Sequence, residues 1–291
     1  MIDTRKQMPA TTINCRGKLI SLDTPKVIGI LNVTPDSFFD GGKHAAEDEI
    51  LAKTEEMLSE GADFIDIGGY SSRPGAAFVS EEEELGRIVP AVKLVSKRFP
   101  EAIISVDTFR SNVAKACVEN GAAMINDISA GLLDEKMIET VSGLSVPYIM
   151  MHIRGTPQTM QQFTDYDDII SNMLFYFSQR IAAARETGIN DLILDPGFGF
   201  SKTLEQNYEV LRKLDLFDIA GVPLLIGISR KSIICKALVV SPENALNGTT
   251  ALHMAALQKG AKVLRVHDVK EAVECVKLFG FLGNQTNGRN V

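Results

Sequence analysis

Short apolar segments alternate with longer amphipathic segments along most of the chain. Each apolar segment has the length of a strand and is rich in Ile, Val and Leu, as expected of parallel strands that are buried on both faces. There are eight of these segments: Val27–Val33, Phe64–Ile67, Ile103–Val106, Met124–Ile125, Tyr148–Met151, Leu192–Leu194, Leu224–Ile228 and Val263–Val266. Because helix-length segments separate them, the pattern predicts an α/β fold, a (β/α)8 TIM barrel.

A second regularity lies in the residues that precede the strands. Glycine ends the expected helix before every second strand, at Gly61, Gly121, Gly188 and Gly260, where it supplies the left-handed backbone that ends a helix. Proline precedes the other four strands and favours an extended backbone there. The alternation supports a barrel of repeated βα pairs, although both residues are common wherever a helix joins a strand.

The two ends of the chain are expected to lie outside the barrel. Thr12–Cys15 and Leu19–Leu22 flank Arg16-Gly17-Lys18, which predicts a β-hairpin that could plug the N-terminal end of the barrel. The chain after Gly280 is rich in Gly and Asn, and we expect it to fray. The predicted organisation is an N-terminal extension over residues 1–24, one barrel over residues 25–280 and a flexible tail over residues 281–291.

Composition and charge exclude several classes of protein. A chain of 291 residues with 45% hydrophobic and 23% charged residues can bury a core without disulfides. The net charge of −7 argues against a nucleic-acid-binding surface, which would be basic. The four cysteines are far apart and form no CxxC pair, which favours reduced thiols in the cytoplasm over a zinc site. Neither a signal peptide nor an apolar run of membrane-spanning length is visible in the sequence.

Polar residues lie at or just beyond the end of every predicted strand. The active site of a (β/α)8 enzyme lies at the carboxyl ends of its strands, so these residues are candidates for chemistry. They are Asn32, Ser72-Arg73-Pro74, Asp107, Asn126, His152, Asp195, Ser229, Lys231, Arg265 and His267. Any one of them could serve only as a cap or a turn residue. Polar groups at all eight strand ends are hard to explain by capping alone.

The alternation of side chains along a strand refines this set, because residues two apart share a face. Arg265 and His267 therefore point the same way, and so do Gly227, Ser229 and Lys231. Gly227 would leave room for a flat ligand near the barrel axis. Arg230 points oppositely and is expected to serve structure. Asp66 lies within its strand, so an inward orientation would make it a buried carboxylate held by an ion pair or hydrogen bonds.

The candidates divide into two chemical groups. The side chains of Asp107, Asn126 and Asp195 could accept hydrogen bonds from a heterocycle with adjacent N–H groups. Arg73, Lys231, Arg265 and His267 could bind a phosphate or a diphosphate. Phe198, Phe200 and Pro74 could form the wall for an aromatic second substrate, or they could pack within their own loops.

Metal and nucleotide motifs are weak. The histidines show no zinc-ligand spacing, and His253 lies in a predicted helix, where a packing role with satisfied hydrogen bonds is expected. The segment from Gly197 to Lys202 does not complete a dinucleotide-binding fingerprint. Mg²⁺ held by Asn32 and by phosphate oxygens of a substrate is conceivable, because Mg²⁺ often uses few protein ligands.

Seven segments together resemble the dihydropteroate synthase family, in the order that the family has them. They are Asn32-Val33-Thr34-Pro35-Asp36-Ser37-Phe38, Gly68-Gly69 with Ser72-Arg73-Pro74-Gly75-Ala76, Asp107-Thr108, Ile125-Asn126-Asp127, Asp195-Pro196-Gly197-Phe198-Gly199-Phe200, Ser229-Arg230-Lys231-Ser232 and Arg265-Val266-His267-Asp268-Val269. The resemblance implies that 4-aminobenzoate displaces diphosphate from (7,8-dihydropterin-6-yl)methyl diphosphate by SN1-like loss of the diphosphate. The product would be 7,8-dihydropteroate, a precursor of folate. It also implies Mg²⁺ as cofactor, a homodimer and a target of sulfonamides.

The resemblance further implies a role for each matching residue. The catalytic set would be Arg73, Lys231, Arg265 and His267. The pterin site would comprise Asp107, Asn126, Asp195, Phe200, Gly227, Lys231 and Arg265. The aminobenzoate site would comprise Ser72, Arg73, Pro74, Phe200, Ser229 and Lys231. Asn32, Arg73, Arg265 and His267 would bind diphosphate, with Mg²⁺ at Asn32.

Two departures and two alternatives stand beside this interpretation. Tyr70 occupies a position where many relatives have Glu, and Ser72 replaces a common Thr but keeps the hydroxyl. One alternative is a methyltetrahydrofolate-dependent methyltransferase, which would share the pterin pocket but has no need for the cationic cluster. The other is a catalytically inactive pterin-binding or interaction subunit, which would have lost such residues.

Overall fold

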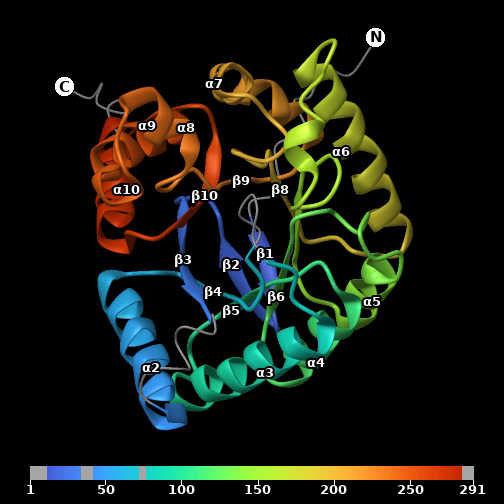
Figure 1. Cartoon of the computed structure of the whole chain (residues 1–291), viewed down its shortest axis with the longest axis vertical. Helices are drawn as coiled ribbons and strands as arrows, with labels where there is room; N and C mark the ends of the chain where they lie inside the picture. Colours follow the sequence, from blue (N-terminus) through green and yellow to red (C-terminus); the bar gives the residue numbers. More distant parts are fainter. Residues whose placement is uncertain (1–11, 34–41, 72–76, 284–291) are drawn as a thin grey trace, which may run out of the picture.

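Eight parallel strands form a closed barrel in the computed structural model, which describes residues 12–33, 42–71 and 77–283 (Figure 1). Around the barrel the order is β10-β3-β4-β5-β6-β7-β8-β9, so neighbours in the chain are neighbours in the sheet. The strands are β3 (Lys26–Asn32), β4 (Phe64–Gly68), β5 (Ile104–Asp107), β6 (Met124–Asp127), β7 (Tyr148–Met151), β8 (Leu192–Asp195), β9 (Leu224–Ile226) and β10 (Ala261–Val266). The (β/α)8 barrel expected from the sequence is confirmed.

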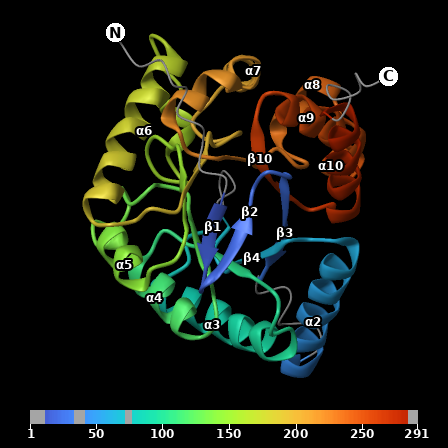
Figure 2. The same ribbon diagram turned by 180° about the vertical axis from the view of Figure 1, so that it is seen from behind.

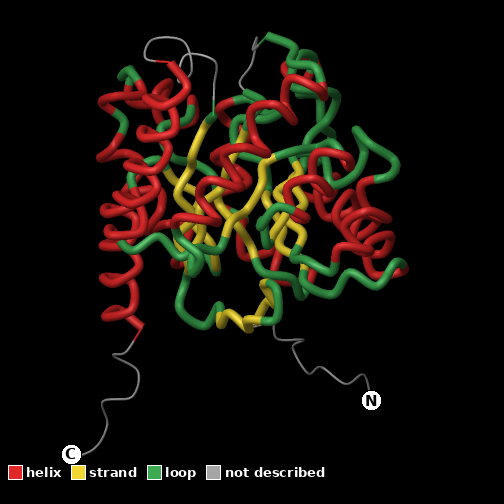
Figure 3. Tube along the Cα trace, turned by 90° about the horizontal axis from the view of Figure 1, so that it is seen from below, coloured by secondary structure: helices red, strands yellow, loops and turns green. Residues whose placement is uncertain are grey.

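Helices surround the barrel on all sides (Figures 1 and 3). The α-helices are α2 (Gly42–Glu60), α3 (Glu81–Arg98), α4 (Ser111–Glu119), α5 (Met137–Leu144), α6 (Ile169–Glu186), α7 (Leu204–Arg212), α8 (Ser232–Leu238), α9 (Leu246–Gln258) and α10 (Val269–Gly283). Short 3₁₀ helices occur at Met160–Gln162, Leu214–Ala220 and Pro242–Asn244. Helix α10 therefore includes the first three residues of the predicted tail, and the division of the chain into domains stays a prediction. None of the helices in the described ranges has the length and apolar character needed to cross a membrane.

Local sequence explains where individual helices begin. Ser80 caps α3, because its hydroxyl accepts a hydrogen bond from the Glu83 amide. Thr203 and Gln206 form a complete capping box at the start of α7, in which each side chain bonds to the backbone of the other. Both devices satisfy amide groups that the first turn of a helix leaves without partners. They fix the points at which the chain leaves the loops above the barrel.

The core has two parts. A large layer lies between the strands and the helices, and the apolar side of α6 (Ile169, Met173, Phe177, Ile181) packs into it. A smaller cluster fills the lower interior of the barrel, with inward side chains such as Ile28, Phe64, Ile193, Leu225 and Val263. This inner plug closes the N-terminal half of the barrel. Polar side chains are left to occupy the carboxyl half.

The N-terminal hairpin covers the base of that plug, as the sequence predicted. Strands β1 (Thr12–Cys15) and β2 (Lys18–Ser21) pair antiparallel around the two-residue turn Arg16-Gly17. Both turn residues have positive φ, which suits the twist of a tight hairpin. Strand β2 begins at Lys18, one residue before the expected Leu19. Ile13, Cys15 and Leu22 pack against the inner cluster. Figures 2 and 3 show the hairpin at one end of the barrel.

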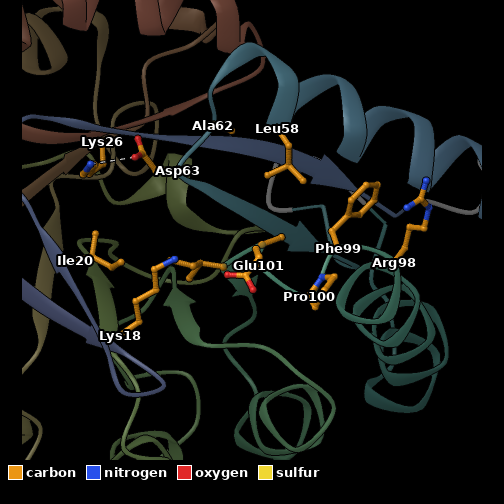
Figure 4. A pocket seen from close by; sticks show the side chains of 12 residues that line it. Lys18, Ile20, Lys26, Leu58, Ala62, Asp63, Arg98, Phe99, Pro100 and Glu101 are labelled. Carbon is orange, nitrogen blue, oxygen red and sulfur yellow. Dashed lines mark ion pairs between the residues drawn. The ribbon is translucent and has the colours of Figure 1, made fainter.

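A hollow of about 510 Å³ lies beside the hairpin (Figure 4). Residues from β2, the start of β3 and the loop before β5 line it, with Lys26 and Asp63 joined by an ion pair of 3.1 Å at its edge. It lies at the N-terminal end of the strands. The active sites of such barrels lie at the opposite end, so this hollow is separate from the candidate site described next.

Candidate active site

Polar side chains from five strands meet in the carboxyl half of the barrel. Asp66 comes from β4, Asp107 from β5, Asn126 from β6, Asp195 from β8 and Arg265 from β10. Because the strands end at Asp107, Asp127 and Asp195 rather than one or two residues earlier, these carboxylates belong to the sheet and not to its loops. The ladder of backbone hydrogen bonds therefore fixes their positions.

Arg265 lies at the centre of this polar layer. Its Nε donates to Oδ2 of Asp66 at 2.6 Å, and its Nη2 donates to Oδ2 of Asp107 at 2.7 Å. The amide of Asn126 donates to the same Asp66 oxygen at 2.9 Å. Asp66 is completely buried, and its Oδ1 has no hydrogen-bond partner in the described part of the chain. The expected buried carboxylate is thus present, and it orients both an arginine and an amide of the predicted pterin site.

Gly227 lies close to two charged residues of the site, Lys231 and Asp195. A Cβ atom placed on Gly227 would lie 3.5 Å from Nζ of Lys231 and 3.7 Å from Oδ2 of Asp195. The other Asp195 oxygen accepts a hydrogen bond from the Gly197 amide at 2.7 Å. Lys231 Nζ donates to the Phe198 carbonyl at 3.0 Å and lies 4.8 Å from the centre of the Phe200 ring. An ammonium, a carboxylate and an aromatic face therefore border the space that a side chain at position 227 would fill.

A turn, and not a strand, brings Ser229 and Lys231 to this space. Strand β9 ends at Ile226, which corrects the predicted end at Ile228, and the Lys231 amide donates to the Ile228 carbonyl across the turn. Ser229 Oγ lies 3.1 Å from Nδ1 of His267 and accepts from the His267 amide. These contacts bring together Ser229 and His267, which belong to two different predicted sets.

Arg230 points away from the site, as expected, and has positive φ. Its guanidinium pairs with both oxygens of Asp268 and donates to the carbonyls of Pro242 and Glu243. These bonds hold a backbone conformation that non-glycine residues seldom adopt. Arg230 thus anchors the turn that carries Ser229 and Lys231.

Burial changes the acidity of the groups in the site. It raises the pKa of Asp107 to about 7, against the opposing charge of Arg265. It raises the pKa of Asp195 and lowers the pKa of Lys231 to about 8, and in both cases the attraction between these two residues opposes it. Burial also disfavours the charged form of Arg265, but the carboxylates of Asp66 and Asp107 outweigh it and raise that pKa. The site holds its charges at the cost of desolvation, which is a common property of binding and catalytic centres.

The aromatic residues of the loop after β8 have different roles. Phe198 is fully buried in the large core between strands and helices, which favours packing over the other role considered for it, the wall for a substrate. Positive φ at Gly197 and Gly199 turns the chain on both sides of it. Phe200 is 8% exposed and packs in a small cluster with Met151 and Met160. Its ring faces Lys231, and its role toward a substrate stays a prediction.

Three predicted residues, Ser72, Arg73 and Pro74, lie outside the described residues. Tyr70, just before them, is buried with its ring edge-on to Phe109 at 5.3 Å, and its hydroxyl accepts from Gln158. Arg110 lies 5.4 Å from the centre of the Tyr70 ring. The Tyr70 side chain therefore packs at the base of this loop.

Asn32 ends β3 and is exposed at the mouth of the barrel. Its Oδ1 lies 3.8 Å from the position of a Cβ on Gly68, next to the Asp107 carboxylate. Within the described ranges, no group of three His, Cys, Asp or Glu side chains could hold a metal. An exposed amide oxygen next to a carboxylate fits Mg²⁺, which keeps several waters and binds substrate phosphates through few protein ligands.

The sequence reasoning missed Lys202 and assigned no role to His152. Lys202 is 4% exposed and its Nζ lies 3.0 Å from Nδ1 of His152, directly behind the Asp195 loop. A lysine that follows a glycine-rich loop is usually exposed, so the sequence carried no signal of its burial. His253 also differs from expectation, because its buried Nε2 has no partner in the described chain.

Comparison with known proteins agrees with this geometry. The family model described as "Pterin binding enzyme" matches residues 28–267. The dihydropteroate synthase of Escherichia coli K12 is 44% identical over 265 residues, which cover 90% of this chain and 93% of that protein. The chain belongs to the dihydropteroate synthase family. The enzyme from Bacillus subtilis is 41% identical over 89% of each chain.

Solved structures of dihydropteroate synthases have the same fold. The Yersinia pestis enzyme with a sulfonamide drug has a TM-score of 0.87 and 42% identity, covering 94% of this chain and 99% of that one. The Xanthomonas albilineans enzyme with 4-aminobenzoic acid has a TM-score of 0.87 and 39% identity over 94% and 98% of the two chains. This chain is therefore a transferase of folate biosynthesis that joins 4-aminobenzoate to (7,8-dihydropterin-6-yl)methyl diphosphate. The methyltransferase alternative is disfavoured.

Proposed function

We propose that the polar layer in the carboxyl half of the barrel binds the pterin ring. Asp107, Asn126 and Asp195 offer acceptors for the ring N–H groups, and Lys231 and Arg265 offer donors. The observation that carries the proposal is the position of Gly227, where an added Cβ would touch both Lys231 Nζ and Asp195 Oδ2. The missing side chain leaves space for a flat ring between the two. Buried polar groups of this kind disfavour any ligand that leaves them without partners.

The aminobenzoate site is proposed on the outer side of Lys231. Phe200 offers an aromatic face there, and Ser229 offers a hydroxyl that is already oriented by His267. The sequence resemblance adds Ser72, Arg73 and Pro74 from the loop after β4. In this arrangement Lys231 borders both substrates, close to the point at which the new C–N bond forms.

The diphosphate is proposed to bind at the mouth, near Asn32, Arg73, Arg265 and His267. Asn32 would hold Mg²⁺ through its side-chain oxygen, with phosphate oxygens and water as the other ligands. When bound, the ion supplies positive charge to the departing diphosphate. Arg265 is already ordered by two carboxylates, so its charge can act on the leaving group with little rearrangement.

The chemistry follows from these positions. An aryl amine is neutral at pH 7, so its attack needs no strong base, and the difficult step is the loss of the anionic diphosphate. Arg73, Arg265 and His267 stabilise the charge that develops on the leaving group. The electron-rich pterin carries the positive charge left on its methylene carbon, and the carboxylates of Asp107 and Asp195 stabilise it. Lys231 positions the amine for attack, and this set forms the proposed catalytic group.

Two further properties are proposed from the family resemblance. We expect a homodimer. Exposed apolar side chains at the end of α8 (Leu238), just after it (Val239) and on α10 (Leu278, Phe281 and Leu282) support an interface there. Sedimentation velocity would test it, since a monomer at micromolar concentration would contradict it. The free state of all four cysteines supports a cytoplasmic location.

The deciding experiment measures diphosphate release from the pterin diphosphate with Mg²⁺, with and without 4-aminobenzoate. Aminobenzoate-dependent release together with formation of dihydropteroate is the expected result. Pterin binding without release would favour the inactive binding subunit. The Asn32→Ala variant should need more Mg²⁺ for half-maximal release, and an unchanged requirement would contradict the proposed metal position.

A further inference from the structure

Lys202 is a buried lysine whose contacts all lie within the protein. Its Nζ lies 3.0 Å from Nδ1 of His152, and it donates to the carbonyls of Gly197 at 3.1 Å and Phe200 at 3.0 Å. An ammonium has three N–H donors, so these three acceptors use all of them. Lys202 has no donor left for a substrate. It can affect the reaction only through the groups that it holds.

Two of the three acceptors, the carbonyls of Gly197 and Phe200, belong to the backbone around two proposed binding residues. The Gly197 amide donates to Oδ1 of Asp195 at 2.7 Å, while the Gly197 carbonyl accepts from Lys202. The same carbonyl accepts from the Phe200 amide at 3.1 Å. The Lys202 ammonium therefore holds the carbonyl of the residue whose amide orients the Asp195 carboxylate. It also holds the Phe200 carbonyl, in the backbone that carries the Phe200 ring.

The third group ties this loop to the neighbouring strand end. The His152 amide donates to the Asp195 carbonyl at 2.9 Å, and its ring packs edge-on against Tyr176 at 4.8 Å. Burial and the nearby positive charge of Lys202 lower the pKa of His152 far below its ordinary value, so the ring is neutral. In the tautomer that carries its proton on Nε2, Nδ1 accepts from the charged form of Lys202. A Cβ on Gly197 would lie 2.3 Å from the His152 carbonyl oxygen. The loop therefore passes close to His152, the residue after β7, and no side chain fits at position 197.

The charge of Lys202 also acts on the Asp195 carboxylate. Burial raises the pKa of Asp195, and the charges of Lys231 and Lys202 oppose this rise. Lys231 approaches Asp195 from the side of the proposed pterin space, whereas Lys202 lies behind the loop. Burial lowers the pKa of Lys202 to about 7, and the Asp195 carboxylate opposes this shift. In its charged form Lys202 therefore favours the ionised Asp195 carboxylate from behind the loop.

We propose that Lys202 is a positioning residue that sets the Asp195 carboxylate and the Phe200 ring for binding of the two substrates. The inference rests on the proposed function, because it assumes that these two residues face pterin and aminobenzoate. It adds a residue that touches neither substrate and yet controls the affinity for both.

The test is the Lys202→Met variant, which keeps the length of the side chain and removes all three donors. We expect pterin affinity, measured by calorimetry, to fall at least tenfold. We also expect the KM for aminobenzoate to rise at least tenfold at saturating pterin diphosphate, with kcat changed by less than threefold. Binding of both substrates within twofold of the wild type would overturn the proposal.

A matched variant separates positioning from loss of stability. Val141→Ala removes buried volume from α5, away from the site, and should lower the melting temperature while leaving both affinities within twofold of the wild type. If Lys202→Met and Val141→Ala weaken binding equally at equal loss of stability, Lys202 is only structural and the proposal is wrong. If Lys202→Met does not fold, Lys202→Gln, which keeps a neutral donor, is judged by the same criteria.

The Asp195→Asn variant tests the proposed pterin pocket separately from the proposed role of Lys202. It should weaken pterin binding at least tenfold if Asp195 faces the pterin. Unchanged affinity in this variant would refute the proposed function of the pocket itself. A large loss in Asp195→Asn together with no loss in Lys202→Met would refute only the positioning role.

Discussion

Arg265 and Asp66 are 199 residues apart in the sequence and are joined by a hydrogen-bonded ion pair of 2.6 Å inside the barrel. The Asp66 side chain is fully buried, and the Arg265 side chain is 15% exposed. Removing one partner of a buried pair leaves an uncompensated charge, which costs far more than the loss of a surface pair. The carboxyl half of the barrel therefore depends on strands β4 and β10 being placed together.

The Asp66→Asn variant should be destabilised by about 3 kcal/mol, because Arg265 would lose a charged partner in a buried site. Urea unfolding monitored by circular dichroism measures this change. The matched control is Asp63→Asn, which breaks the partly exposed pair with Lys26 and should cost about 1 kcal/mol or less. Equal losses of unfolding free energy in the two variants would show that burial does not increase the contribution of the Asp66–Arg265 pair to stability.

The Gly227→Ala variant should bind pterin at least tenfold more weakly and keep its stability. The added methyl would meet Lys231 and Asp195 at ordinary contact distances, so the empty site accommodates it and the ligand does not. Calorimetric titration with a pterin measures the affinity. Gly143→Ala, with open space around it in α5, should bind normally and gain about 0.5–1 kcal/mol of stability. Normal binding by Gly227→Ala would remove the main support for the pterin position.

Turnover should fall as the pH rises through about 8. Burial lowers the pKa of Lys231 to about 8, so its ammonium is present below this pH and is lost above it. A profile of kcat/KM for pterin diphosphate between pH 6.5 and 9.5 tests the prediction. In Lys231→Arg, which stays charged over this range, the alkaline decline should disappear even if activity is lower throughout. The same decline in both proteins would assign it to another group.

Stability should decrease as the pH falls from about 6.5 toward 4, in part because of His253. Burial lowers its pKa to about 4, whereas the unfolded chain binds a proton near the ordinary value of about 6.5. The unfolded state therefore takes up a proton first, which costs the folded state up to about 3 kcal/mol at the acid end of this window. The full contribution is present above the unfolded pKa.

The His253→Leu variant isolates this contribution. Its Nε2 has no partner in the described chain, so replacing the ring should lose little at pH 7.5 and should reduce the difference in unfolding free energy between pH 7.5 and pH 5. Urea unfolding at the two pH values provides the comparison. The same pH dependence in wild type and variant would mean that His253 is not protonated on unfolding in this range.

The hydrophobic pattern of the sequence was sufficient to predict the barrel and the approximate bounds of its strands. Buried parallel strands are short and apolar. The ends of the predicted strands therefore lie within two residues of the observed ends. The two-residue turn of the hairpin was visible in the same local way. The expectation that Arg230 serves structure agrees with its pair with Asp268. The strand alternation used to reach it does not apply there, because β9 ends at Ile226 and residues 229–231 form a turn.

Tertiary structure alone decided how these residues are paired. Whether Asp66 meets Arg265 depends on closure of the sheet between β10 and β3, and no local pattern encodes it. Lys202 is buried because the loop after β8 folds back on β7, and Phe198 is buried because glycines on both sides turn it into the core. Local periodicity fixes which face of an element a side chain occupies, while long-range contacts depend on how all eight strands pack together.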